Sequence, residues 1–268
     1  MTNNSIALIA GNGRFPIIFA QETHKQGRKI TAIAIKEETS PELADCVDKI
    51  FWIGVGELKK VLDILVDERI KEVVMAGQIK AIRLFRGEAK PDSELSYILK
   101  AIKSRQPYII FREVSKRLGK LGIRLLDSST YLSHLLAEKG VITVVKPTAE
   151  QLEDIKFGKK IVRKIARLEI GQTVVVRDKV VLAVEAIEGT DQAIKRGGTL
   201  AKGAVVVKAS KPRHDMRFDI PVIGPQTIKS MQAADARCLA IEAKKSLLID
   251  RDQTIGLADN SGICIAAF

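Results

Sequence analysis

The opening stretch of the chain most constrains its fold, because an apolar run, a glycine-containing turn, a helical segment and a second apolar run follow one another. The first run is Ile6–Ala10, and the turn after it reads GNGRFP. The pattern then predicts a helix over 15–26, which Gly27 ends, and a strand over 29–35. Strand, helix and strand in this order form the repeating unit of a parallel sheet, so the chain begins as an α/β protein.

The same alternation continues and completes an N-terminal domain. Helical segments separate three further apolar runs, which are predicted as strands at 50–53, 72–76 and 123–126. We therefore predict a parallel-sheet α/β domain over residues 1–130.

A change of composition marks the end of this domain. Residues 127–140, DSSTYLSHLLAEKG, predict a capped helix that bridges to a second domain, and the linker is expected over 131–147. Thr148 and Gln151 have the spacing of a capping box and predict the start of a long helix. A second α/β domain is expected over 148–268.

Charge is the compositional feature that bears most on function. Lysine and arginine total 44 against 32 aspartates and glutamates, and the formal net charge is +12 at pH 7. Such a field suits nucleic acid, an anionic membrane face or a phosphorylated substrate. The basic residues are spread along the chain without interleaved aromatic residues, which argues against nucleic acid as the main partner.

The cysteines and the apolar runs indicate the compartment. Cys46, Cys238 and Cys264 are widely spaced in apolar surroundings, which argues against a disulfide framework or a metal cluster and favours a reducing cytoplasm. The first apolar run is too short for a signal peptide, and no run approaches the length that spans a bilayer. Any membrane contact is expected to be peripheral.

The turn Gly11-Asn12-Gly13-Arg14 is a candidate phosphate or nucleotide site, because it follows a strand and precedes a helix. The dinucleotide fingerprint needs a third glycine where this chain has Pro16, and Glu37 at the next strand end is not a distinctive ribose partner. A tight turn without a ligand is the alternative.

Gln78 follows the strand predicted at 72–76. Since ligands of open α/β sheets sit beyond the carboxyl ends of strands, Gln78 and the Gly11 turn could face one crevice.

The stretch Val180–Gly198 brings three carboxylates to a strand end and a helix start. Val180–Val184 reads as a strand, and Thr190 can cap a short helix. Glu185, Glu188 and Asp191 therefore crowd one turn. Acidic residues favour helix N-termini, so a capping turn accounts for Glu188 and Asp191 without a ligand.

A second charged segment, Lys208 to Ile228, is less easily explained as a solvated surface. An extended backbone would place Asp215, Arg217 and Asp219 on one face, as on an edge strand defended by charge. Ile-Pro-Val follows Asp219, so its carboxylate is expected close to the core, where it needs a metal, a cation or a proton. The two charged segments together indicate a site for a charged ligand, with or without a divalent metal.

These segments resemble a known family. The matching stretches run nearly the whole length of the chain: IALIAGNGRFP, VVMAGQI, IGQTVVV, VLAVEAIEGTDQAIKR, KASKPRHDMRFDIPVIGPQTI and ADNSGICIAAF. Their order and the EGTD and RFDIPVIG segments resemble the bacterial UDP-2,3-diacylglucosamine pyrophosphatase family of lipid A biosynthesis, the type distinct from the metallophosphoesterase that performs this step in other bacteria.

The resemblance implies Mg²⁺-dependent hydrolysis of the diphosphate of UDP-2,3-diacylglucosamine to UMP and 2,3-diacylglucosamine 1-phosphate. It also implies that the N-terminal domain is Rossmann-like and that the C-terminal domain is catalytic and has a fold particular to the family. Substrate is expected to bind between the domains, and water is expected to attack the phosphorus on the sugar side. Asp219 matches an essential acid and Asp191 a second acid. Both are the expected catalytic residues and Mg²⁺ ligands, and Asp219 could instead orient the water.

The expected substrate contacts lie in the same matching stretches. Basic side chains would neutralise charge on the phosphoryl oxygens; these are Lys208, Lys211 and Arg217. The turn from Gly11 to Arg14 would hold the nucleotide, and the remaining expected contacts are Gln78, Glu188 and Thr190. His214 and Asp215 depart from the family pattern, as does the segment AGQIKAIRL, which lacks a proline.

Two other classes of function stay open. A non-catalytic sugar-nucleotide or lipid-phosphate binding protein is the first alternative, and a basic nucleic-acid binder is the second. For the enzyme, the positive field would favour the anionic cytoplasmic face of the inner membrane, and a homodimer is the expected assembly.

Overall fold

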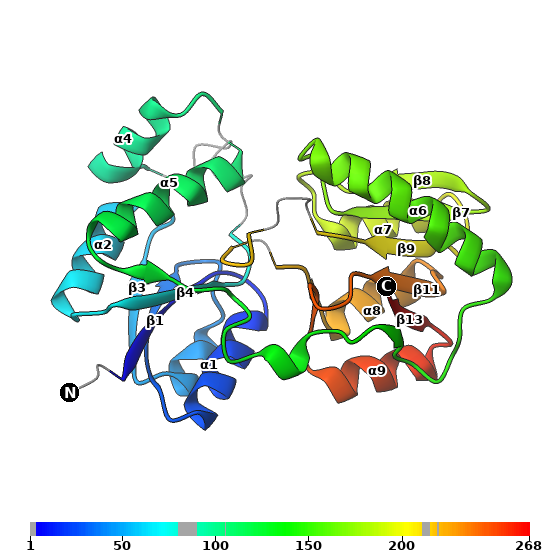
Figure 1. Ribbon diagram of the computed structural model, residues 1–268, viewed down its shortest axis with the longest axis horizontal. Coiled ribbons are helices and arrows are strands. Elements are labelled where there is room, and N and C mark those ends of the chain that lie inside the picture. Colours follow the sequence, from blue (N-terminus) through cyan, green and yellow to red (C-terminus); the bar gives the residue numbers. More distant parts are fainter. Residues whose placement is uncertain (1–3, 80–89, 105, 211–214, 219) are drawn as a thin grey trace. The chain divides into compact units, whose positions relative to one another are not determined.

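The computed structural model describes residues 4–79, 90–104, 106–210, 215–218 and 220–268. The chain divides into two compact units, one of residues 1–132 with 215–219 and one of residues 133–214 with 220–268. Each unit is a sheet with helices on both faces, which confirms the predicted α/β class (Figure 1). Element labels are those of Figure 1.

Within the described residues, the first unit has five parallel strands in the order β3-β2-β1-β4-β5. Their bounds are β1 Ser5–Ala10, β2 Lys29–Ile35, β3 Lys49–Ile53, β4 Glu72–Ala76 and β5 Arg124–Leu125. The central strands are buried on both faces, as parallel sheets require, which explains why they read as continuous apolar runs.

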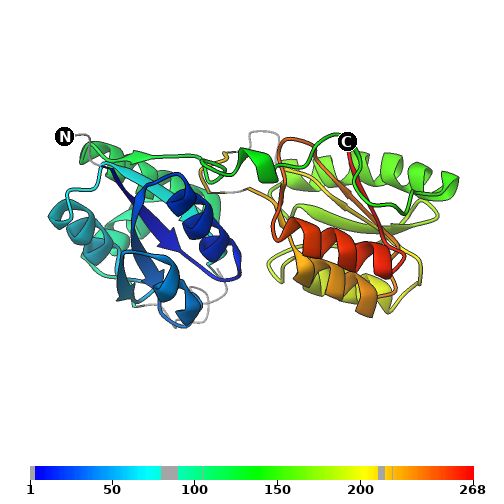
Figure 2. The ribbon, with the colours of Figure 1, turned by 90° about the horizontal axis from the view of Figure 1, so that it is seen from below.

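Helices cover the two faces of this sheet (Figures 1 and 2). The helices are α1 Phe15–Lys25, α2 Leu58–Asp67, α4 Ser93–Ala101 and α5 Pro107–Lys120, with a 3₁₀ turn η1 over Pro41–Cys46. One core joins α2, α4 and α5 to strand residues such as Ile33 and Met75. Leu65 of α2 is fully buried there, and burial of one such side chain contributes about 2 kcal/mol.

The second unit is built on a mixed sheet. Among the described residues its strand order is β6-β13-β11-β9-β7-β8, with β9, β11 and β13 parallel and β6, β7 and β8 joined to their neighbours antiparallel. The bounds are β6 Gly140–Val141, β7 Thr173–Arg177, β8 Val180–Val184, β9 Val205–Lys208, β11 Cys238–Ile241 and β13 Cys264–Ala267. A separate parallel pair joins β10 Val222–Ile223 to β12 Leu247–Leu248.

Helix α6, Ala149–Arg167, covers one face of this mixed sheet (Figure 1). The predicted capping box is present, because Thr148 Oγ1 accepts from the Gln151 amide at 3.3 Å and Gln151 Oε1 accepts from the Thr148 amide at 3.0 Å. The opposite face packs against α7 Thr190–Gly198, α8 Pro225–Ala233 and α9 Arg251–Asn260. None of the described helices is both long and apolar enough to traverse a bilayer.

The connection between the predicted domains differs from expectation. The helix expected over 127–140 is wrong: this stretch contains turns, the short 3₁₀ element η2 Ser133–Leu135 and strand β6. Because β6 pairs with β13 and Ala137 lies in the core, residues 133–147 belong to the second unit and are not a free linker. Residues 215–218 pack with the first unit, although they lie between β9 and β10 in the sequence.

Candidate active site

The first candidate cluster lies at the carboxyl ends of β1 and β4. From β1 the chain passes through α1 to β2 on one side of β1, and β4 lies on the other side. The strand order therefore reverses between β1 and β4, which is where open α/β sheets bind ligands.

The structure joins the two predicted turns at this position. The Asn12 amide donates to the Gln78 carbonyl at 2.7 Å, the Gln78 amide donates to the Asn12 carbonyl at 3.3 Å, and the Gly11 amide donates to the Ala76 carbonyl at 2.9 Å. Glycine is needed on both sides: a Cβ at Gly11 would lie 2.7 Å from the Gln78 carbonyl oxygen, and one at Gly77 would lie 2.6 Å from that of Asn12. The two turns are thus held backbone to backbone.

The rest of the Gly11 turn is exposed. Gly13 has a φ of +90° with open space where a Cβ would lie, and Arg14 is the N-cap residue of α1. The first turn of α1 carries no acidic residue to occupy the positive end of the helix dipole. This arrangement can accept an anion, as the sequence predicted, and its use for phosphate stays a prediction.

Sequence reasoning missed the acidic residue nearest this turn. It pointed to Glu37, but Glu37 adopts a φ of 65°, and the next residue, Glu38, is the buried one at 5% exposure. Asn12 Nδ2 donates to Glu38 Oε2 at 3.5 Å. Thr39 Oγ1 donates to the Ala10 carbonyl at 2.6 Å, so the ends of β1 and β2 are tied together. An acid near the second strand end is the signal that could have found Glu38.

The second cluster lies on the edge of the mixed sheet where β8 and β9 end. Lys208, the last residue of β9, pairs in register with Thr173 at the start of β7, and Glu185 directly follows β8. Lys208 Nζ donates to Thr190 Oγ1 at 2.9 Å, and Thr190 Oγ1 donates to Glu185 Oε1 at 2.9 Å. The sheet register therefore brings together Lys208 and Thr190, two of the predicted contacts, with Glu185.

Thr190 does not play the capping role expected from the sequence. Gly189, with a φ of 87°, is the N-cap residue of α7, and Thr190 is the first residue of the helix. The expectation that Thr190 caps α7 is wrong, because its hydroxyl is engaged with Glu185 and Lys208.

The other two acids of this turn differ in how they are engaged. Glu188 accepts from the Ala186 amide at 3.1 Å and from Arg196 Nη2 at 2.8 Å. Burial alone would raise the pKa of Glu188, but hydrogen bonds from its own amide, from Arg196 and from Ala186 outweigh burial and lower the pKa. The Glu188 carboxylate thus stabilises the turn, as in the capping interpretation.

Asp191 lies in the first turn of α7 and is partly exposed. Within the part of the chain that the structure describes, its carboxylate makes no hydrogen bond or ion pair. The described ranges hold no cluster of three or more metal-ligating residues, but Mg²⁺ commonly takes one or two carboxylates and completes its shell with substrate oxygens and water. Asp191 fits that ligand pattern.

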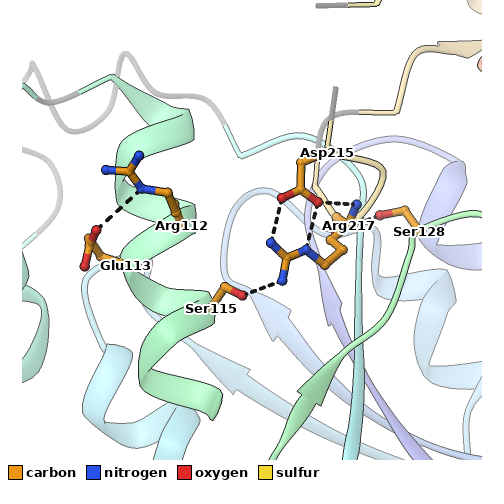
Figure 3. Close-up of polar contacts among 6 residues, drawn as sticks. All are labelled: Arg112, Glu113, Ser115, Ser128, Asp215 and Arg217. Atoms are coloured by element: carbon orange, nitrogen blue, oxygen red, sulfur yellow. Dashed lines mark hydrogen bonds and ion pairs between the residues drawn. The ribbon is translucent and has the colours of Figure 1, made fainter. Parts of the chain in front are cut away.

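Arg217 lies in the segment that packs with the first unit, and Figure 3 shows its surroundings. Its Nε and Nη2 donate to the two carboxylate oxygens of Asp215 at 2.8 and 2.7 Å, and its Nη1 donates to Ser115 Oγ of α5 at 2.9 Å. The bond to Asp215 raises the pKa of Arg217. The guanidinium therefore has internal partners, and its role as a phosphate contact stays a prediction.

The backbone here turns and is not extended, so the alternation that would place Asp215 and Arg217 on one face does not apply. The Phe218 amide donates to the Asp215 carbonyl at 3.3 Å, and the Arg217 amide donates to Asp215 Oδ1 at 3.2 Å. Ser128 fixes this turn, because its amide donates to the Met216 carbonyl at 2.8 Å and its hydroxyl lies 2.9 Å from the Arg217 carbonyl (Figure 3).

The Phe218 ring anchors the same turn against α5. It lies 5.6 Å from the ring of Tyr108 and 5.8 Å from that of Phe111, between ring centroids. We call residues 215–218 the anchor turn. Two predicted residues, Asp219 and Lys211, lie outside the described residues.

Comparison with known proteins adds the family. Residues 5–135 match the LpxI N-terminal domain and residues 138–266 match the LpxI C-terminal domain. A relative from Caulobacter vibrioides, the UDP-2,3-diacylglucosamine pyrophosphatase LpxI, is 28% identical over 276 residues, which cover 97% of this chain and 96% of the relative.

Similarity to solved structures is weak. The biotin carboxylase domain of Hydrogenobacter thermophilus 2-oxoglutarate carboxylase is 9% identical with a TM-score of 0.29, covering 72% of this chain and 40% of that one. Rhizobium etli pyruvate carboxylase is 14% identical with a TM-score of 0.30, covering 71% of this chain and 15% of that one. Neither bears on fold or function. The two domain matches, consecutive and together spanning nearly the whole chain, show that it belongs to the LpxI family.

Proposed function

We propose that this chain hydrolyses the diphosphate of UDP-2,3-diacylglucosamine to UMP and 2,3-diacylglucosamine 1-phosphate. The observation that carries the proposal is the nearly full-length similarity to the Caulobacter pyrophosphatase of that name. Water adds to the phosphorus on the sugar side, the bond from that phosphorus to the bridging oxygen breaks, and UMP leaves with the bridging oxygen. The proton released from the water passes to solvent or to a carboxylate.

The first unit is proposed to bind the nucleotide. The turn from Asn12 to Arg14, which is exposed at Gly13 and Arg14, leads into a helix N-terminus without acidic residues, which suits a phosphate. Gln78 is exposed beside this turn and is a proposed contact with the polar part of the substrate.

The second unit and the charged segment after Lys208 are proposed to stabilise the charge of the diphosphate. The Lys208 ammonium donates to Thr190 at the start of α7, and Asp191 is the proposed carboxylate ligand of Mg²⁺ there. When bound, Mg²⁺ would neutralise charge on the phosphate oxygens. Asp219 is proposed as the second acid, which either orients the water or completes the metal site, and Lys211 and Arg217 are proposed to add positive charge.

The test is to incubate the purified protein with UDP-2,3-diacylglucosamine, with Mg²⁺ and then with EDTA, and to measure both products. Metal-dependent release of UMP and the lipid monophosphate is expected, and in H₂¹⁸O the label should enter the lipid monophosphate. Label in UMP would contradict attack on the sugar side. Tight binding of the substrate without any product would favour the non-catalytic binding protein.

Variants locate the reaction. Asp219→Ala and Asp191→Asn should retain folding and substrate binding while turnover is lost. Asp252 is a matched control, because it is an exposed acid in the first turn of α9 in the same unit. Asp252→Asn should leave turnover unchanged, and near-normal turnover of Asp219→Ala would overturn its assignment.

We also propose that α6 faces the anionic cytoplasmic surface of the inner membrane, where an acylated substrate resides. It carries six basic residues, of which Lys159 is half-buried and the others are exposed: Lys156, Lys159, Lys160, Arg163, Lys164 and Arg167. Four of them, with Leu152 and Ile155, line a shallow hollow of about 360 Å³, and Leu152 is 52% exposed. Basic residues near an anionic bilayer contribute about 1 kcal/mol each.

The homodimer and the cytoplasmic location stay predictions. Sedimentation velocity on the purified chain measures the first. Fractionation of cells, with activity followed in the soluble and membrane fractions, measures the second.

A further inference from the structure

Three polar side chains form a continuous hydrogen-bonded chain where β8, β9 and α7 meet. Lys208 ends β9, Thr190 begins α7 and Glu185 follows β8. The distances are 2.9 Å from Lys208 Nζ to Thr190 Oγ1 and 2.9 Å from Thr190 Oγ1 to Glu185 Oε1. All three residues are partly buried.

The chemistry of these groups fixes the direction of the chain. An ammonium only donates hydrogen bonds and an ionised carboxylate only accepts them, whereas a hydroxyl has one hydrogen to donate. Thr190 must therefore accept from Lys208 and donate to Glu185. If the Thr190 hydroxyl hydrogen pointed at Lys208, it would face the ammonium hydrogens and leave Glu185 without its donor. Donation to Glu185 is therefore the arrangement that satisfies all three groups.

Surrounding groups hold the carboxylate and the hydroxyl in place. The Gln172 amide donates to Glu185 Oε2 at 3.3 Å, so both carboxylate oxygens are engaged. The buried hydroxyl of Thr173 lies 3.4 Å from Thr190 Oγ1. Thr173 is the first residue of β7 and is in register with Lys208, and Gln172 immediately precedes it.

Lys208 keeps donors for a ligand. Its ammonium has three hydrogens, and within the described part of the chain it donates one hydrogen bond, to Thr190. A lysine side chain loses rotamer entropy when it is fixed, and the bond to Thr190 fixes it before any ligand arrives. The remaining hydrogens can point at an anion.

We infer that Glu185 and Thr190 are positioning residues that hold the Lys208 ammonium for the diphosphate of the substrate. This inference rests on the proposed function, in which Lys208 binds a phosphoryl oxygen. We call the hydrogen-bonded chain from Lys208 through Thr190 to Glu185 the relay. Since the ammonium would be prepared for the charge that develops during hydrolysis, loss of the relay should lower kcat more than it raises KM.

The first test uses variants of Thr190. Thr190→Val keeps the shape and removes the hydroxyl, and it should lower kcat by about tenfold to a hundredfold, as expected for a misplaced catalytic group. Thr190→Ser restores the hydroxyl and should recover most of kcat. Equal losses in both variants, or a change in KM alone, would overturn the inference.

A double-mutant cycle separates positioning from a merely structural role. If Thr190 acts through Lys208, adding Thr190→Val to Lys208→Ala should lower kcat no further. Additive losses would show that Thr190 acts independently of Lys208 and would overturn the relay. Glu185→Gln should lower kcat in the wild-type background and have no further effect beside Lys208→Ala, with melting temperatures recorded for every variant.

A measurement without substrate distinguishes failure of the relay from failure of the proposed function. The protons of a hydrogen-bonded lysine ammonium exchange with water slowly enough for the group to be observed by ¹⁵N NMR. The signal that is absent from Lys208→Arg is assigned to Lys208. We expect the signal in the wild type and in Thr190→Ser and its loss in Thr190→Val. If it persists in Thr190→Val, the relay is refuted whatever the substrate proves to be; if the relay signals behave as expected but the wild type lacks hydrolase activity, the proposed function alone fails.

Discussion

Adding single methyl groups at three glycines tests the close approach of the two turns in the first unit. At Gly11 a Cβ would lie 2.7 Å from the Gln78 carbonyl oxygen, and the backbone needs no left-handed conformation. At Gly13 φ is +90°, and no atom lies within 4 Å of the added carbon. At Gly77 φ is +86° and a Cβ would lie 2.6 Å from the Asn12 carbonyl oxygen. Gly11→Ala therefore tests crowding alone, Gly13→Ala tests backbone strain alone, and Gly77→Ala tests both together.

The structure gives each change a magnitude. A left-handed conformation costs an alanine about 1 kcal/mol. Crowding must separate the turns and break the two backbone hydrogen bonds that join Asn12 and Gln78, at about 1 kcal/mol each. The free energy of unfolding should therefore fall by about 2 kcal/mol in Gly11→Ala, about 1 kcal/mol in Gly13→Ala and about 3 kcal/mol in Gly77→Ala.

Urea titration followed by circular dichroism measures these differences, with the midpoint compared at constant slope. Gly13→Ala is the matched control, because it changes the same turn without crowding. If Gly11→Ala and Gly77→Ala are no more destabilising than Gly13→Ala, the turns are not held together in solution, and the reasoning about this edge of the sheet is refuted.

Three other perturbations follow from the structure. Hydrogen bonds, first from Arg28 and then from Arg124, lower the pKa of Glu72 below its ordinary 4.5, so Glu72→Gln should destabilise the protein at pH 7. The difference in melting temperature between wild type and variant should shrink as the pH falls below 4.5 and vanish below the lowered pKa. A difference that persists in acid would contradict this prediction. Phe218→Ala should lower kcat by loosening the anchor turn. Phe51 packs on the same core, and Phe51→Ala should affect stability alone. Equal kcat values for the two variants would contradict this prediction. Neutralising Lys156, Lys160, Arg163 and Lys164 of α6 should reduce the fraction of protein that sediments with phosphatidylglycerol vesicles. Neutralising four basic residues on the opposite helices and their loops, Lys195, Lys202, Lys229 and Arg251, should leave that fraction unchanged.

Much of the fold could be predicted from local patterns. The strand at Lys29–Ile35 and the capping box at Thr148 have the predicted positions, because apolar periodicity and cap chemistry act within a few residues. The helix predicted over 127–140 is wrong because only its local composition favours a capped helix. Pairing of β6 with β13 takes residues 140–141 into the sheet instead. That pairing joins residues more than a hundred positions apart and leaves no local signal.

The candidate sites divide in the same way. The sequence by itself determined the turn at Gly11, the acids around Gly189 and the charged segment after Lys208, since residue type and spacing identify them. Only the tertiary structure decided how they are used. Sheet register joined Lys208 to Thr190 and Glu185, packing on α5 turned Arg217 toward Asp215 and Ser115, and strand order brought Gln78 to Asn12. Hydrogen-bond partners depend on distances between segments remote in the chain, and burial of the whole core, rather than any local preference, sets those distances.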